Sequence, residues 1–170
     1  HIIKAEIFKQ GAEYVGAISN YTQAYNETKS MHSMIELLNL NLLSENWLES
    51  IQWAEKIYED LYLIDGVHAT DVLFNIALAY RETASSYYNL GIKVIEQLNE
   101  ETRPSRSELQ ECINNYNIAL EYFDQSRDYF LEAEDLGSDD ASSRATQIKQ
   151  YMRSIENDLI PLIQNQMDSN

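Results

Sequence analysis

Apolar side chains recur every three or four positions along most of the chain, which is the spacing of one face of an α-helix. The longest such stretches run over residues 73–94, 109–133 and 145–162. Near the N-terminus the same spacing alternates small and aromatic residues, namely Ala5, Phe8, Gly11, Tyr14, Ala17, Tyr21 and Ala24. Small residues let a second helix approach to about 8–10 Å, and the aromatic residues between them fill the groove. The pattern therefore predicts helices packed on helices.

Short polar segments interrupt the pattern and supply residues that can cap helices. They predict about five helices, over residues 2–44, 46–64, 67–101, 106–136 and 140–167, with a weak point in the first near residues 26–30. The side chains expected to cap helix N-termini are those of Asn46, Ser105 or Ser107, and Asp139 or Asp140. The glycines expected to end helices in the left-handed conformation are Gly66 and Gly137.

The chain holds only 5 glycines and 2 prolines in 170 residues, and it lacks β-hairpin signals. We therefore expect one all-α domain of antiparallel helices joined by short loops, with repeat-like hairpins over residues 1–136 and a C-terminal capping helix over residues 140–167. The residues expected in its core are Ala17, Tyr21, Ile51, Ile76, Tyr80, Tyr116, Phe123, Phe130, Ile148 and Ile155.

Residues 11–24 resemble the second helix of a tetratricopeptide repeat, with Ala17, Tyr21 and Ala24 at the small, aromatic and small positions of that family. Ala5 and Phe8 match its first helix, and similar segments around Ser50, Gly91 and Ser126–Ala133 follow at intervals close to about 34 residues. The resemblance implies a degenerate stack of helical hairpins with a concave groove. The family also needs a turn near residues 83–86 and 117–120, and no residue there breaks the helical pattern. An up-and-down bundle of four or five long helices is therefore the alternative.

The formal net charge of −16 disfavours nucleic acids and anionic membranes as partners, because both are polyanions. The single cysteine excludes an internal disulfide bond and a thiolate metal site. No apolar run reaches the roughly 18–20 residues that span a bilayer, so we expect no membrane insertion of this segment. The helical pattern is already running at Ile2 without a capping residue, which suggests a piece of a longer protein. The sequence leaves open whether the protein is cytoplasmic or extracytoplasmic.

Candidate chemical sites are sparse. His32 with Glu36 and Asp65 with His68 each bring only two metal-ligating side chains together, whereas a metal site needs three or four. The 12 tyrosines lie mostly on the apolar seams, so core packing is expected before a ring-lined ligand pocket. The sequence predicts no cofactor and no enzymatic activity.

Two functions fit these observations. The first is a non-enzymatic scaffold that binds a protein or peptide, preferably a basic or amphipathic helix, in the groove of the repeat stack. Its inner face would carry His32, Ile35, Asn39, Leu42, Asp71, Phe74, Leu78, Arg81, Glu108, Glu111 and Asn115. The second is an extracytoplasmic ligand-sensing helical bundle of a membrane receptor. Flanking sequence would separate the two, because only the sensor requires apolar segments of about 20 residues on both sides.

Overall fold

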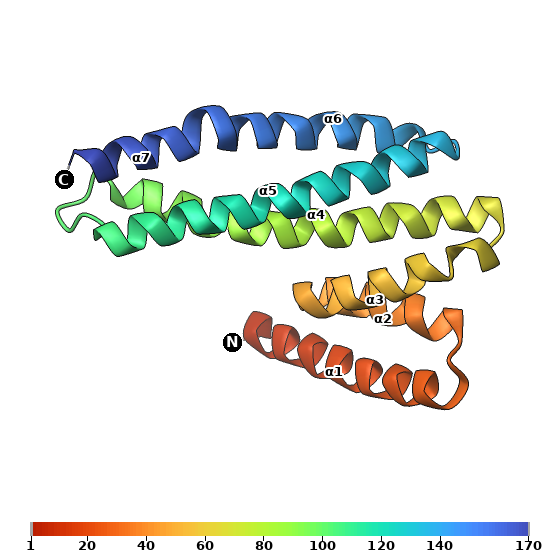
Figure 1. Cartoon of the computed structure of the whole chain (residues 1–170). Helices are drawn as coiled ribbons and strands as arrows, with labels where there is room; N and C mark the ends of the chain where they lie inside the picture. The colour runs from red at the N-terminus through yellow and green to blue at the C-terminus, as the bar shows by residue number, and fades with distance from the viewer. Residues whose placement is uncertain (1, 170) are drawn as a thin grey trace. The chain divides into compact units, whose positions relative to one another are not determined.

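The computed structural model describes the backbone of residues 2–169, and the side chains of residues 11–66 and 68–169. Helices make up 87% of the chain, and no strand occurs in the described part, which confirms the all-α class (Figure 1). The elements are α1 (Ile2–Thr28), α2 (Met31–Leu43), α3 (Trp47–Glu59), the 3-10 turn η1 (Leu61–Leu63), α4 (Gly66–Gln97), α5 (Arg106–Asp135), α6 (Asp139–Ser154), the π-helical turn η2 (Ile155–Leu159) and α7 (Ile160–Asp168).

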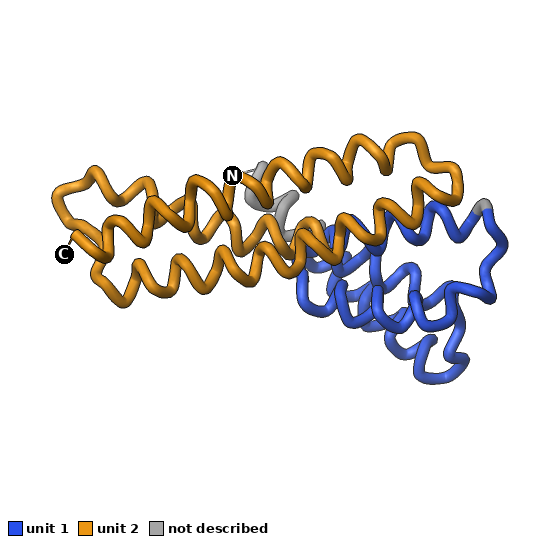
Figure 2. Tube along the Cα trace, turned by 45° about the horizontal axis from the view of Figure 1, so that its top comes forward, with its two compact units in different colours: residues 1–79 blue, residues 80–170 orange. Residues whose placement is uncertain are grey.

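Contacts divide the chain into two compact units, residues 1–79 and residues 80–170, with the boundary inside α4 (Figure 2). We call them unit 1 and unit 2. The sequence placed an internal division near residue 136 instead, and the single domain that it predicts stays a prediction.

Unit 1 is built around α2, which packs against both α1 and α3. The weak point predicted near residues 26–30 is confirmed, because α1 ends at Thr28 and the hydroxyl of Ser30 caps α2 by accepting a hydrogen bond from the amide of Ser33. The prediction that Gly66 ends a helix was wrong. Gly66 is the first residue of α4, and the carboxylate of Asp65 caps that helix by accepting from the His68 amide at 3.0 Å.

Unit 2 contains the remainder of α4, then α5, and then α6, which continues through η2 into α7 in the same direction. The last part of α4, α5 and this continuous segment run up and down (Figure 1). The predicted closing role of Gly137 is confirmed by its φ of 103°. Ser105 and Glu108 form a reciprocal capping box at the start of α5, whereas Ser138 precedes α6 in place of the predicted Asp139 or Asp140. The whole predicted seam of α5 is buried, namely Leu109, Cys112, Tyr116, Ala119, Phe123, Ser126, Phe130 and Ala133.

The seam predicted for the last helix holds only up to Ile155. Beyond it the predicted apolar seam continues through Leu159 and Leu162, but Ile163 and Met167 are buried instead and Leu162 is 37% exposed. The cause is the π turn η2, which inserts one extra residue and rotates the following face. Pro161 explains the wider turn, because a proline has no amide hydrogen and its ring clashes with the carbonyl four residues earlier, at Asn157.

The core prediction is confirmed at most positions. Ala17 and Tyr21 are only half-buried, while the other expected core residues are buried. The predicted packing of Ala5 and Phe8 lies outside the described side chains. Both α4 and α5 are uninterrupted where a tetratricopeptide repeat has a turn, near residues 83–86 and 117–120. The resemblance to that family stays a prediction.

Candidate functional site

Four tyrosines form a ladder across α4 and α5 in unit 2. Tyr80 pairs with Tyr129 at 5.1 Å between ring centroids, and Tyr87 stacks on Tyr122 at 6.0 Å with an angle of 19° between the rings. On each helix the two rings are seven residues apart, so both lie on nearly the same face. We call this set the tyrosine ladder. Of its four rings only that of Tyr80 is fully buried, while those of Tyr87, Tyr122 and Tyr129 are half-buried.

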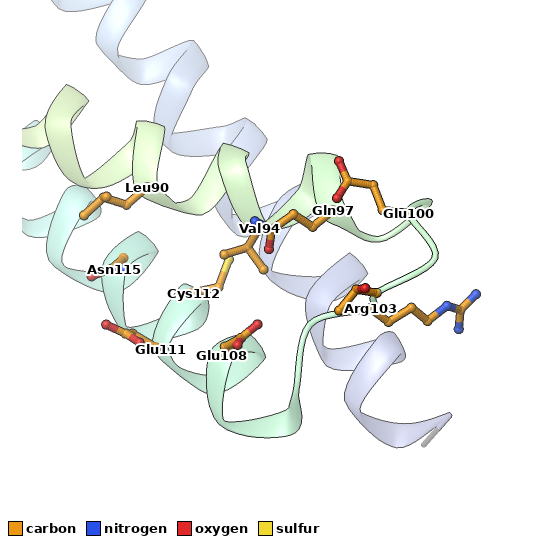
Figure 3. Close-up of a pocket in the computed structure, with 10 residues that line it drawn as sticks. Leu90, Val94, Gln97, Glu100, Arg103, Glu108, Glu111, Cys112 and Asn115 are labelled. Atoms are coloured by element: carbon orange, nitrogen blue, oxygen red, sulfur yellow. The ribbon is translucent and has the colours of Figure 1, made fainter.

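The next layer of the same seam is open. Seven residues beyond Tyr87 lies Val94, and seven residues before Tyr122 lies Asn115, and both side chains are smaller than tyrosine. A cavity of about 530 Å³ occupies this position. We call it the α4–α5 cleft; its lining residues are Leu90, Val94, Gln97, Glu100, Thr102, Arg103, Glu108, Glu111, Cys112 and Asn115 (Figure 3).

The rim of the cleft is acidic and its floor is apolar. Glu100, Glu108 and Glu111 are exposed, and Arg103 is the cation among the lining residues. The side chain of Arg103 points away from the cleft in Figure 3. Leu90, which is 44% exposed, supplies uncovered apolar surface. The cleft can therefore hold an apolar side chain between helices while its rim attracts positive charge.

Local sequence positions the rim residues. The amide of Glu108 donates to the Ser105 hydroxyl at 3.1 Å, and one carboxylate oxygen of Glu108 accepts from the Ser105 amide at 3.4 Å. This capping box fixes the start of α5 and holds Glu108 at the cleft. Glu111 follows one turn later on the same helix.

Below the cleft, α4 and α5 are in close contact. A Cβ atom added to Gly91 would lie 2.4 Å from Cζ of Tyr116, so only glycine lets the helices meet here. The Cys112 thiol donates to the Gly91 carbonyl at 3.6 Å, and burial raises the pKa of this thiol to about 11. Burial also raises the pKa of Tyr116, whose hydroxyl is buried without a hydrogen-bond partner. The thiol is therefore a protonated floor residue and a poor nucleophile at neutral pH.

The residues predicted for one inner face divide between the two units. In unit 1, His32 and Asp71 are exposed, and the half-buried ones are Ile35, Asn39, Leu42, Phe74 and Leu78. In unit 2, Glu108, Glu111 and Asn115 come together in the cleft. Arg81 does not join them. Its guanidinium donates to Gln147 of α6 at 3.5 Å, and it precedes Leu90 by about 14 Å along α4. The continuous inner face over both units stays a prediction.

The other residues that line the cleft were not predicted as site residues from the sequence, namely Leu90, Val94, Gln97, Glu100, Thr102 and Arg103. A usable signal was present, because tyrosines recur at seven-residue steps on both helices and then give way to Val94 and Asn115. Such a change from large to small side chains on paired helices indicates a hollow.

The histidine pairs behave as local structure. His68 Nδ1 lies 2.7 Å from a carboxylate oxygen of Asp65 at the start of α4, and His32 packs edge-on against the Tyr21 ring. Among the described residues, no group of three or more histidine, cysteine, aspartate or glutamate side chains is arranged to hold a metal ion. No helix in the described part of the chain is long and apolar enough to cross a membrane.

Comparison of the chain with protein-family models, with curated protein sequences and with solved structures gives no significant match.

Proposed function

We propose that the protein is a non-enzymatic helical scaffold that binds a basic, amphipathic helical segment of a partner protein in the α4–α5 cleft. The observation that carries the proposal is the combination of an apolar floor, formed by the exposed Leu90 and the half-buried Val94, with an acidic rim at Glu100, Glu108 and Glu111.

The size of the cleft suits such an occupant. Its volume of about 530 Å³ lies within the roughly 300–1,000 Å³ of typical ligand pockets, so it has room for the apolar side chains of one helical turn. An amphipathic helix presents such side chains at positions i, i+3 and i+4. Lysine or arginine residues beside them would then lie next to the carboxylates of the rim.

The charge of the whole chain supports the same partner. With a net charge of −16, the protein attracts cationic segments from a distance and speeds their approach. The rim carboxylates then add short-range interactions that depend on their exact position. These two contributions respond differently to substitution, which makes the site testable.

The test uses a leucine- and lysine-containing amphipathic peptide of about 18 residues, long enough to form a helix. A peptide of the same pattern with glutamate in place of lysine is its control. We expect isothermal titration calorimetry to detect the basic peptide and not the acidic one. Binding should weaken as salt rises from about 0.05 to 0.5 M, because the Debye length falls from roughly 14 to 4 Å.

Two charge-matched variants distinguish the cleft from the general acidity of the chain. Glu100→Gln with Glu111→Gln removes rim carboxylates and should weaken binding at least about tenfold, equivalent to about 1.4 kcal/mol. Glu121→Gln with Asp128→Asn removes the same charge from exposed positions of α5 outside the cleft, and should change binding less than about threefold. Equal weakening in both variants, or no binding of the basic peptide, would contradict the proposal.

A further inference from the structure

Unit 1 carries a cluster of aromatic and cationic side chains where the end of α1 meets α3. The rings of Tyr25 and Trp53 make an edge-to-face contact with centroids 4.8 Å apart. Lys29 Nζ lies 4.6 Å from the Tyr25 centroid, and Lys56 Nζ lies 5.3 Å from the same centroid and 4.7 Å from that of Trp53. We call these four residues the lysine–aromatic cluster.

The Tyr25 ring limits how far apart the two ammonium groups of this cluster can lie. Because both approach the Tyr25 centroid so closely, they are at most about 10 Å apart, comparable to the Debye length of about 8 Å at physiological salt. The ring faces compensate part of their repulsion through cation–π attraction. An anion bound by both ammonium groups would offset more of this repulsion.

Neither lysine has a carboxylate partner. In the described part of the chain, whose sequence is strongly acidic, no aspartate or glutamate oxygen comes within 4.0 Å of Lys29 or Lys56. The carboxylate of the neighbouring Glu27 accepts instead from the Gln23 amide at 3.2 Å. Both lysines are exposed, whereas the two rings are half-buried and hold them in place. Among the described residues, the two ammonium groups therefore lack an ion-pair partner on a protein of net charge −16.

We propose that the lysine–aromatic cluster binds a phosphate monoester. The dianionic form of this group matches two neighbouring ammonium groups in charge and offers three acceptor oxygens. The edges of the aromatic rings carry partial positive charge, and the indole N–H of Trp53 is a donor with no acceptor among the described residues. The site belongs to unit 1 and does not depend on the function proposed for the cleft.

The phosphate monoester could belong to a phosphorylated peptide or to a small metabolite, and the choice of probes distinguishes these sources. The probes are phenyl phosphate, a phosphoserine peptide, the same peptide without phosphate, and inorganic phosphate. Binding is followed by NMR at the Trp53 indole N–H, which is assigned by comparison with Trp47→Phe. We expect saturable shifts with both monoesters and none with the unphosphorylated peptide. At least tenfold tighter binding of the phosphopeptide would identify a protein source, and equal affinities would identify a small molecule.

The decisive variant is Lys29→Gln with Lys56→Gln. Lys29 has a left-handed backbone with φ of 51°, and glutamine keeps the backbone cost nearly unchanged. The matched control is Lys93→Gln with Lys149→Gln, which removes the same charge from exposed positions in unit 2. We expect at least a tenfold loss of affinity in the first variant and less than a twofold change in the control. Equal losses in both variants, or no indole shift with either monoester at about 10 mM, would overturn the proposal.

Discussion

The tyrosine ladder and the α4–α5 cleft are neighbouring parts of one helix pair, yet one is filled and the other is open. Along the ladder, the rings of Tyr80 and Tyr87 meet those of Tyr129 and Tyr122. One layer further, Val94 and Asn115 occupy the equivalent positions, and a cavity of about 530 Å³ takes the place of the rings. Side-chain size therefore decides where this surface is closed.

The cleft does not arise because the helices separate. Beneath it, Gly91 of α4 lies against the Tyr116 ring of α5, with no room for even one added carbon atom. At the position of Gly91, α4 and α5 are therefore tightly packed, although the cleft beside this contact is open. The Gly91–Tyr116 contact therefore keeps α4 and α5 together beneath the cleft.

The largest difference in stability should appear between two truncations, one at a buried position of α5 and one at the cleft. Phe130 is fully buried, so Phe130→Ala should lower the free energy of unfolding by about 3–5 kcal/mol. Leu90→Ala at the cleft should cost less than about 1 kcal/mol, because Leu90 is already 44% exposed. Urea denaturation measures both values. Similar losses would show that the cleft is closed in solution.

The second largest effect on stability concerns the contact between Gly91 and Tyr116 beneath the cleft. Gly91→Ala places a Cβ against the Tyr116 ring and should destabilise the protein by about 1–3 kcal/mol through overpacking. The smaller side chain of Tyr116→Leu should remove most of that penalty in the double variant. A double-mutant cycle by chemical denaturation isolates this coupling, and additive effects would contradict the close contact.

Much of the fold could be predicted from the sequence because local signals agreed with tertiary packing. The seam of α5 keeps a regular spacing between the Ser105 capping box and the closing Gly137, and every predicted seam residue is buried. The last helix was harder to predict, since Pro161 widens one turn and rotates the positions after Ile155. A periodic pattern cannot reveal such a shift without knowledge of the backbone.

The residues predicted for a binding face overlap the candidate cleft only in part. Glu108, Glu111 and Asn115 were selected for a helical face and do lie together in the cleft, but Arg81 contacts Gln147 of α6 instead. The facing residues on α4, such as Leu90 and Val94, depend on how two helices align with each other. That register follows from the Gly91–Tyr116 contact, which the spacing along either helix alone does not show.

A smaller effect on stability should follow when the pH is raised, because the buried Cys112 thiol then loses its proton. Burial raises the pKa of the Cys112 thiol from 9.0 to about 11, so the folded protein holds this proton more tightly than the unfolded chain. The resulting stability is fully present below pH 9 and is lost as the pH rises to about 11. Denaturation curves across this range should therefore fall less steeply with pH for Cys112→Ala than for the wild type. Identical slopes would show that the thiol is exposed.

The smallest expected change in stability comes from extending the ladder by one layer. Val94→Tyr places a ring seven residues beyond Tyr87 and opposite the small Asn115, so the new side chain should fill the cleft. Because the ring enters existing space, the free energy of unfolding should change by less than about 1 kcal/mol. Binding of the basic peptide should nevertheless weaken at least about tenfold, since the apolar floor is covered while every rim carboxylate remains. The matched control is Leu131→Tyr, which adds a ring at an exposed position of α5 outside the cleft. Unchanged binding in Val94→Tyr would show that the peptide binds by charge alone and that the hollow beside the tyrosine ladder has no part in recognition.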